Sequence, residues 1–393
     1  MNNTLSLSLS KPILLLILVS ILIPNRGALI IYGQLPPTII YGLSTIFILG
    51  LSFLGLLSFN KVKNSKILQT KNLLMLNFLI GLYYLCLHFL SLKVFDAGIL
   101  YITFFPFLII LFLQVDSKQL ENLFFFSGSI LSISILINVY NVIAGGFDYL
   151  LSYNQALRPE TEAVSSSGES YRIGGFTGSY HDSANLLGMF TIYSLLNFIT
   201  NKSPKFLLFG ALFLFCLLVT LSAANILIAA FVIFLSIIYY LKFFIPIVYF
   251  FIFITAIFLV FVFPQLEIYD GLLSRIVDAD WEGLTRNLSF EMVLTPYFWV
   301  GFGQHFNSIF IDNEVAFLKM ILSRGLLPSI IIFLFIIYPF LLFIKNNKLL
   351  FNASPAAFSI LFGFLSLAHY GSLLRSTNLV IFLVLYALFI KEY

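Results

Sequence analysis

Long apolar runs, separated by short polar connections, dominate the hydrophobic pattern of this chain. A helix that spans a bilayer needs about 20 mostly apolar residues, and twelve runs come close to or exceed this length. They cover residues 12–31, 37–59, 72–91, 98–115, 122–144, 183–200, 206–222, 225–241, 244–263, 315–344, 355–371 and 377–390. The pattern predicts an all-α polytopic membrane protein of about 12 transmembrane helices, which form a single integral membrane domain over residues 1–393.

The first run has a competing interpretation. Pro24, Asn25 and Arg26 interrupt it, and residues 12–23 alone match the apolar core of a signal peptide. The apolar pattern resumes directly at Ala28, and this favours a transmembrane helix.

The composition excludes an ordinary water-soluble domain. Hydrophobic residues make up 60% of the chain and charged residues only 10%, whereas soluble chains carry about 25% charged residues. Lipid must therefore be the solvent for most of the apolar surface. Cys86 and Cys216 both lie inside apolar runs, so neither a disulfide framework nor a thiolate metal site is expected.

Lysine positions predict the orientation in the membrane. With a cytoplasmic N-terminus, twelve of the fourteen lysines fall on the cytoplasmic side, and only Lys93 and Lys319 do not. Both termini are then cytoplasmic, and the two long connections, residues 145–182 and 264–314, form large periplasmic loops. We expect a multi-pass protein of a bacterial inner membrane, with its active site facing the periplasm.

The seven arginines have the opposite distribution, because all of them fall on the periplasmic side or within apolar runs. Arginine is costly there and needs a partner. A diphosphate is one such partner, because the planar guanidinium binds phosphate oxygens with two parallel hydrogen bonds. The alternative is pairing with loop carboxylates or lipid phosphates. The candidate diphosphate-binding residues are Arg172, Arg286, Arg324 and Arg375.

Polar residues that open the tenth apolar run are candidates for proton transfer. Asp312, Asn313 and Glu314 stand where the second long loop enters the membrane, and they either cap the helix or form the floor of a polar cavity. On a helix, Asp312 would share a face with Lys319, either as a buried ion pair or as part of that cavity.

Several other loop residues admit two interpretations. His181 and His305 are expected at the outer surface, as proton acceptors or as solvated hydrogen-bonding groups. Trp281 begins an apolar stripe that is typical of a helix lying in the membrane interface. The glycines of residues 174–178 are expected to form tight turns, and the spacing of Asp278 and Asp280 favours a helix cap over a metal site.

Three sequence blocks resemble the superfamily of O-antigen polymerases and O-antigen ligases. Residues 172–185, RIGGFTGSYHDSAN, resemble the family's arginine, Gly-Phe and Pro-Asn block, with Ala184 in place of proline. Arg286 followed by Pro296 and residues 300–303, VGFG, resembles the arginine helix and its glycine turn. Residues 312–318, DNEVAFL, ahead of Arg324, resemble a motif that begins with His-Asn in ligases and often with an acidic residue in polymerases.

The resemblance implies a GT-C-like membrane glycosyltransferase that uses no nucleotide, cofactor or metal. It implies a polymerase of surface polysaccharide that transfers glycan, with inversion, from a polyprenyl diphosphate carrier to the non-reducing end of a lipid-linked repeat unit. Its expected partners are that lipid-linked oligosaccharide, the bilayer and a chain-length regulator, with no nucleic acid. Asp312 is the first candidate for the catalytic base, with Glu314 and His305 in reserve. The candidate glycan contacts are His181, Asn185, Trp281 and Asn313.

Two alternatives remain at this point. A ligase would move finished glycan to another acceptor, although Asp312 in place of histidine favours a polymerase. A flippase or transporter of lipid-linked glycan would also suit about twelve helices. Transporters usually have related halves and charges at the membrane midplane, whereas here the halves differ and the charges lie outside.

Overall fold

The computed structural model describes most of the predicted helices. It covers residues 37–59, 68–90, 103–157, 173–175, 177, 179–240, 298–299, 317, 320–321, 325–346, 354–368, 371–374 and 376–392. The first and ninth predicted spans lie outside these residues.

All regular structure in the described part of the chain is helical, as the sequence predicts. The elements follow each other as α3 (Pro37–Leu57), α4 (Leu68–Leu90), the 3-10 turn η3 (Phe105–Phe107), α6 (Leu108–Phe112), α7 (Ser117–Leu157), α8 (Tyr180–Asn201), α9 (Pro204–Val219), α10 (Ala223–Tyr240), α17 (Leu326–Asn346), α18 (Pro355–Ser366), the 3-10 turn η7 (Gly371–Leu374) and α19 (Ser376–Glu392).

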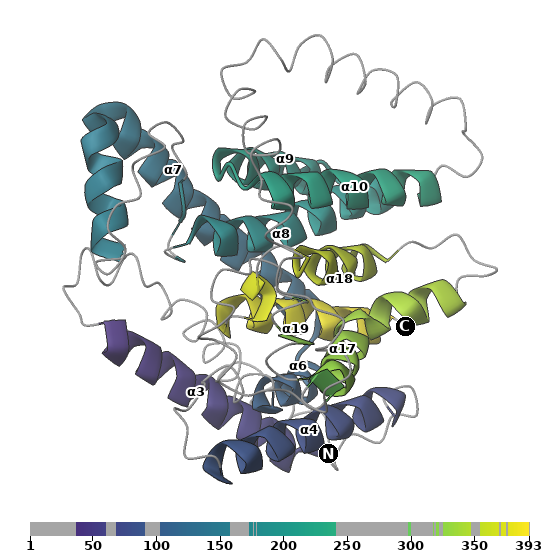
Figure 1. Ribbon diagram of the computed structural model, residues 1–393. Coiled ribbons are helices and arrows are strands. Elements are labelled where there is room, and N and C mark those ends of the chain that lie inside the picture. The colour runs from purple at the N-terminus through teal and green to yellow at the C-terminus, as the bar shows by residue number, and fades with distance from the viewer. Residues whose placement is uncertain are drawn as a thin grey trace, which may run out of the picture.

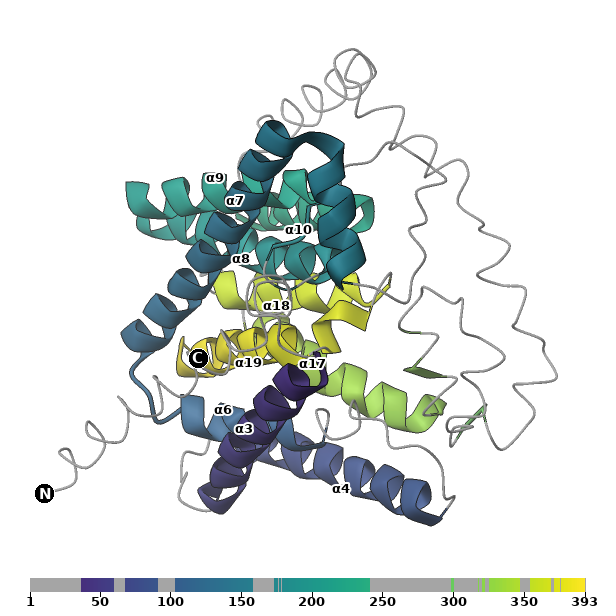
Figure 2. The same ribbon diagram turned by 90° about the vertical axis from the view of Figure 1, so that its left-hand side faces the viewer.

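Helix α19 occupies the centre of the molecule. Helices α8, α9 and α10 lie on one side of α18 and α19, and α3, α4 and α6 lie on the other (Figures 1 and 2). Every residue from Asn378 to Phe389 is buried, because α19 packs against α6, α7, α8, α17 and α18. A helix that is apolar all round is expected at such a central position.

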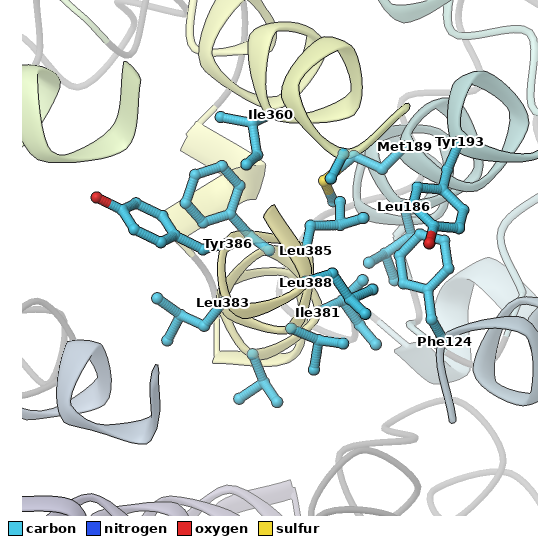
Figure 3. Close-up of a cluster of buried hydrophobic side chains, with 14 of the residues drawn as sticks. Phe124, Leu186, Met189, Tyr193, Ile360, Ile381, Leu383, Leu385, Tyr386 and Leu388 are labelled. Atoms are coloured by element: carbon cyan, nitrogen blue, oxygen red, sulfur yellow. The ribbon is translucent and has the colours of Figure 1, made fainter. Parts of the chain in front are cut away.

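Figure 3 shows how α19 fills this core. Its side chains radiate in several directions, with Tyr386 on one side and Leu385 and Leu388 on others. Met189 and Tyr193 from α8 pack around them. Tyr386 also stacks on Phe335 of α17, with ring centroids 5.2 Å apart. The core is therefore built from segments that lie far apart in the sequence.

Phenylalanine holds α7, α8 and α9 together. The rings of Phe124 on α7 and Phe190 on α8 have centroids 4.5 Å apart, and Phe190 lies 5.4 Å from Phe213 of α9. Phe125 stacks on Phe209 at 5.0 Å. Aromatic pairs at these separations stabilise packing beyond their buried area, and this accounts for part of the chain's high phenylalanine content.

The bundle has two chemically different ends, which follow from the alternating direction of its helices. Tyr193 in the second half of α8 contacts Glu121 near the start of α7, and Asn138 further along α7 contacts Gly174 just before α8, so α7 and α8 run antiparallel. We call the end at which α8 and α10 begin the His181 end, and the end at which α19 finishes the Glu392 end. The lysines at the start of α7, at the junction of α8 and α9 and at the ends of α17 and α19 belong to the Glu392 end: Lys118, Lys202, Lys205, Lys345 and Lys391.

Large apolar side chains cover several outward faces. Ile46 on α3, Ile143 on α7 and Leu208 on α9 are each more than two-thirds exposed. Within the described residues, three helical segments are long and apolar enough to cross a membrane, namely Ser117–Asn141, Tyr180–Asn201 and Leu326–Lys345, of 25, 22 and 20 residues. A water-soluble surface rarely carries so much apolar area, so the structure agrees with a helical membrane protein.

Three predicted spans differ from the helices observed. The fourth, residues 98–115, is interrupted by η3, which the short α6 follows, because Pro106 favours a tight turn there. The tenth, residues 315–344, is not one helix, since Gly325 adopts a positive φ of 87° and α17 begins after it. The fifth continues as α7 to Leu157, past the expected start of the loop at residue 145, and α7 bends along its length (Figure 2).

Candidate functional site

The segment before α8 forms one wall of a polar cluster at the His181 end. The side-chain amide of Asn138 on α7 donates to the Gly174 carbonyl over 2.8 Å. The Gly175 N–H donates to Ser183 Oγ over 3.1 Å, and Thr177 Oγ1 lies 2.6 Å from the same hydroxyl. A side chain at Gly175 would collide with α7, so glycine permits the close approach. Among the described residues of this segment only Thr177 lies in a turn, so the tight turn expected of the glycines stays a prediction.

Ser179 starts α8 and sets the position of His181. Its hydroxyl accepts a hydrogen bond from the Asp182 N–H over 3.5 Å, as an N-cap serine does. Because α8 begins at Tyr180, His181 lies in the first helical turn and packs against the start of α10. His181 is buried, with 8% of its surface exposed, so it is not the solvated hydrogen-bonding group that one interpretation expected, and its place on the periplasmic side stays a prediction.

The turn between α9 and α10 supplies two further polar side chains. Ser222 Oγ lies 3.4 Å from Nδ1 of His181. Asn225 donates its side-chain amide to the same Ser222 Oγ over 3.0 Å. Both residues are buried, so this hydrogen-bonded row reaches from α10 to the first turn of α8.

A second row joins α8 to α18 and α19. The Asn378 amide donates to the Asp182 carbonyl and to Oδ1 of Asn185, each over 3.1 Å. Asn185 in turn donates to Ser366 Oγ over 2.5 Å. Asn185 is fully buried, and in this structure its amide binds the protein itself. Its predicted contact with glycan stays a prediction.

The structure brings together only part of the predicted site. His181 and Asn185 lie in the polar cluster, defined as the polar side chains of Asn138, Thr177, Ser179, His181, Ser183, Asn185, Ser222, Asn225, Ser366 and Asn378. The other predicted residues lie outside the described part of the chain: Arg172, Arg286, Arg324, Arg375, His305, Asp312, Glu314, Trp281 and Asn313. In sequence, Arg172 immediately precedes Ile173, and Arg375 immediately precedes α19.

Eight cluster residues were not predicted as site residues, and three of them, Thr177, Ser179 and Ser183, lie within the block of residues 172–185. The other five are uncharged polar residues near the predicted periplasmic end of an apolar run: Asn138, Ser222, Asn225, Ser366 and Asn378. Polar side chains within membrane helices usually hydrogen-bond between helices. The position of these residues at the same end of several apolar runs could therefore have predicted that they meet. Neither a charge nor a motif distinguishes these amides and hydroxyls in the sequence.

Hydroxyl and amide groups dominate the polar cluster, which joins α7, α8, α10, α18 and α19. Groups of this kind donate and accept hydrogen bonds without carrying charge, and sugar hydroxyls require such partners. Among the described residues, no three His, Cys, Asp or Glu side chains lie close enough together to hold a metal ion.

No protein-family model, curated protein or solved structure matches this chain. The geometry of the cluster and the residues of the chain therefore carry the functional argument alone.

Proposed function

We propose that this chain is a membrane glycosyltransferase that polymerises repeat units of a surface polysaccharide. It transfers glycan from a polyprenyl diphosphate carrier to the non-reducing end of a lipid-linked repeat unit, with inversion at the anomeric carbon. The observation that carries the proposal is the polar cluster. It collects hydroxyls and amides at one end of an apolar bundle, and residues 173–185, which belong to a block resembling the polymerases, form a large part of it.

The distribution of charge supports the same proposal. Five described lysines, at the ends of α7, α8, α9, α17 and α19, lie at the Glu392 end, and lysine marks the cytoplasmic side of membrane proteins. In this orientation the polar cluster faces the periplasm, where lipid-linked repeat units are joined. Exposed apolar faces of the helices keep the polyprenyl tails in lipid while the glycans reach the cluster.

The proposed reaction requires the protein to stabilise the departing diphosphate and to accept a proton. The acceptor sugar hydroxyl attacks the anomeric carbon while the bond from that carbon to the diphosphate oxygen breaks. Arg172, Arg286, Arg324 and Arg375 stabilise the charge that develops on the departing diphosphate. Asp312, or in its place Glu314 or His305, takes the hydroxyl proton. The polar cluster orients the glycan through hydrogen bonds.

A deletion strain distinguishes this function from its alternatives. Loss of a polymerase leaves single repeat units on the cell surface. Loss of a ligase leaves long chains on the polyprenyl carrier and none on the surface, and loss of a transporter leaves units on the cytoplasmic face. Surface glycan is analysed by gel electrophoresis and carrier-linked glycan by mass spectrometry, and either of the last two patterns contradicts the proposal.

Complementation of that strain tests the arginines. Arg172→Lys and Arg286→Lys keep the charge and remove the forked donor geometry, so each variant is expected to restore little polymer while still reaching the membrane. Thr191→Val is the control, because Thr191 is buried on α8 about 9 Å along the helix from Asn185, and the change preserves shape. Full polymer length from both lysine variants would contradict the proposed binding of the diphosphate by these two arginines.

A further inference from the structure

The turn that joins α8 to α9 carries two lysines on a well-defined backbone. Lys202 ends α8 with a left-handed φ of 52°, and its N–H donates to the Phe198 carbonyl over 2.8 Å. Ser203 is extended, as a residue before proline prefers, and Pro204 then begins α9. Lys205 follows in the first turn of α9. The turn therefore fixes the points from which the two lysine side chains extend.

Both lysines are exposed, and neither forms an ion pair with a carboxylate in the described part of the chain. The ammonium of Lys205 lies 4.5 Å from the centroid of the Phe206 ring, and Phe206 is buried and packs against Phe125 of α7. In the sequence, no aspartate or glutamate occurs between Asp182 and Glu267. The turn therefore presents two positive charges that no acidic residue of the same segment neutralises.

Exposed aliphatic side chains adjoin these lysines on both helices. Leu208 lies three residues after Lys205 on α9, and residues at this spacing share a helix face. Ile199 lies in the last turn of α8, just before Lys202. Both aliphatic side chains are exposed, Leu208 by 72%. Positive charge thus stands beside apolar surface, in the order in which a phospholipid carries its phosphate beside its acyl chains.

The other described lysines at the Glu392 end have different surroundings. Lys118 lies two residues after the exposed Asp116. Lys391 donates to the Val115 carbonyl, and Lys345 is a single lysine in the last turn of α17. Among the described helix ends, the α8–α9 turn is therefore the place where two exposed lysines occur together without a nearby acidic residue in the sequence.

We propose that the α8–α9 turn binds an anionic phospholipid in the membrane leaflet at the Glu392 end. Lys202 and Lys205 contact the phosphate and the negatively charged headgroup, and Ile199 and Leu208 lie against the acyl chains. In the predicted orientation this leaflet is cytoplasmic, where an anionic membrane surface attracts lysines that lie next to the membrane. The site requires a helical membrane protein but no particular reaction, so it is independent of the proposed glycosyl transfer.

Removal of charge from the turn tests the proposal, with the lipid headgroup as the variable. Lys202→Asn combined with Lys205→Gln removes both charges, and asparagine suits the left-handed backbone at position 202. The control pair, Lys118→Gln with Lys345→Gln, removes the same net charge from two other helices. Native mass spectrometry of the solubilised protein counts the phosphatidylglycerol or phosphatidylcholine that it retains. We expect wild type and control to prefer phosphatidylglycerol, and the turn pair to bind it about tenfold or more weakly.

Thermal unfolding in nanodiscs gives a second measurement. Phosphatidylglycerol should raise the unfolding midpoint of the wild type above its value in phosphatidylcholine alone, because a ligand that binds only the folded state stabilises it. This shift should shrink in the turn pair, remain in the control pair and weaken at high salt. Lys202→Arg with Lys205→Arg keeps the charge and should keep the shift. Equal retention of both lipids by the wild type, an unchanged preference in the turn pair, or loss of the shift in the arginine pair would contradict the proposal.

Discussion

At the scale of single residues, Asn378 is the polar group that ties the central helix to the polar cluster. Its amide serves two acceptors on α8, the Asp182 carbonyl and Asn185 Oδ1. Asn378→Ala leaves buried acceptors without this donor, and we expect it to cost about 1–3 kcal/mol of unfolding free energy. Denaturant titration in detergent measures the loss. Because Asn185 shares the bond, Asn185→Ala combined with Asn378→Ala should cost less than the sum of the single losses, and strict additivity would contradict the pairing.

Glycine at position 175 offers a second residue-scale prediction. A methyl group there would come within 2.8 Å of the Leu131 side chain and would also meet Ser134 Oγ, both on α7. Gly175→Ala is expected to lower the unfolding free energy by about 1–3 kcal/mol. Gly50→Ala on α3 is the matched control, because a methyl group at Gly50 meets nothing within 4 Å. That control should be neutral or stabilising by about 0.5–1 kcal/mol.

At the scale of elements, α19 is central, so its side chains should contribute more to the unfolding free energy than those on the outward faces of other helices. Leu385 is fully buried, whereas Leu208 on α9 is 72% exposed. We expect Leu385→Ala to cost about 2–5 kcal/mol through the cavity that it leaves. Leu208→Ala should stay within about 0.5 kcal/mol. Equal effects in detergent-solubilised protein would mean that α19 is not the core of the bundle.

The last turn of α19 gives a prediction that depends on pH. The residue Glu392 as a whole is exposed. Its side-chain carboxylate nevertheless accepts a hydrogen bond from the Ser354 hydroxyl over 2.9 Å. Loss of solvation raises the pKa of Glu392 to about 7, Ser354 opposes the rise and nearby Glu121 adds to it. A raised pKa contributes stability that is present below the ordinary value of 4.5 and is lost as the pH rises through about 7.

Glu392→Gln should therefore remove this pH dependence, because an amide stays neutral and still accepts from Ser354. Between pH values of about 5 and 8, the thermal midpoint of the wild type should fall relative to that of the variant. Asp116→Asn is the control, since Asp116 is exposed at the same end of the bundle. Parallel profiles for wild type and Glu392→Gln would show that solvent screens the carboxylate fully.

The elements also show what the sequence can and cannot predict. Length and apolar content predict α8 and α9 nearly to their ends, because lipid demands continuous helices. The same criterion failed at Gly325 and Pro106, where local backbone preferences interrupt apolar runs. The polar cluster was only partly predicted, since its members come from five helices and no sequence rule pairs Asn378 with Asn185.

At the scale of the whole molecule, the separation of the two ends is the feature with most consequence for function. Lysines mark one end, and the hydroxyls and amides of the polar cluster mark the other. The buried apolar side chains around α19, drawn in Figure 3, form the core of the bundle. A molecule built in this way suits a reaction whose substrates have a polar glycan and a long apolar tail.

Reconstitution tests the central claim most directly. Purified protein in proteoliposomes is given the polyprenyl diphosphate repeat unit that accumulates in the deletion strain, with no nucleotide sugar, and the products are separated by length. We predict a ladder that grows by whole repeat units, together with released polyprenyl diphosphate, and a strongly reduced ladder from Arg172→Lys beside a normal one from Thr191→Val. A wild-type protein that leaves the repeat unit unchanged, or that moves it across the bilayer without joining it, would contradict the account.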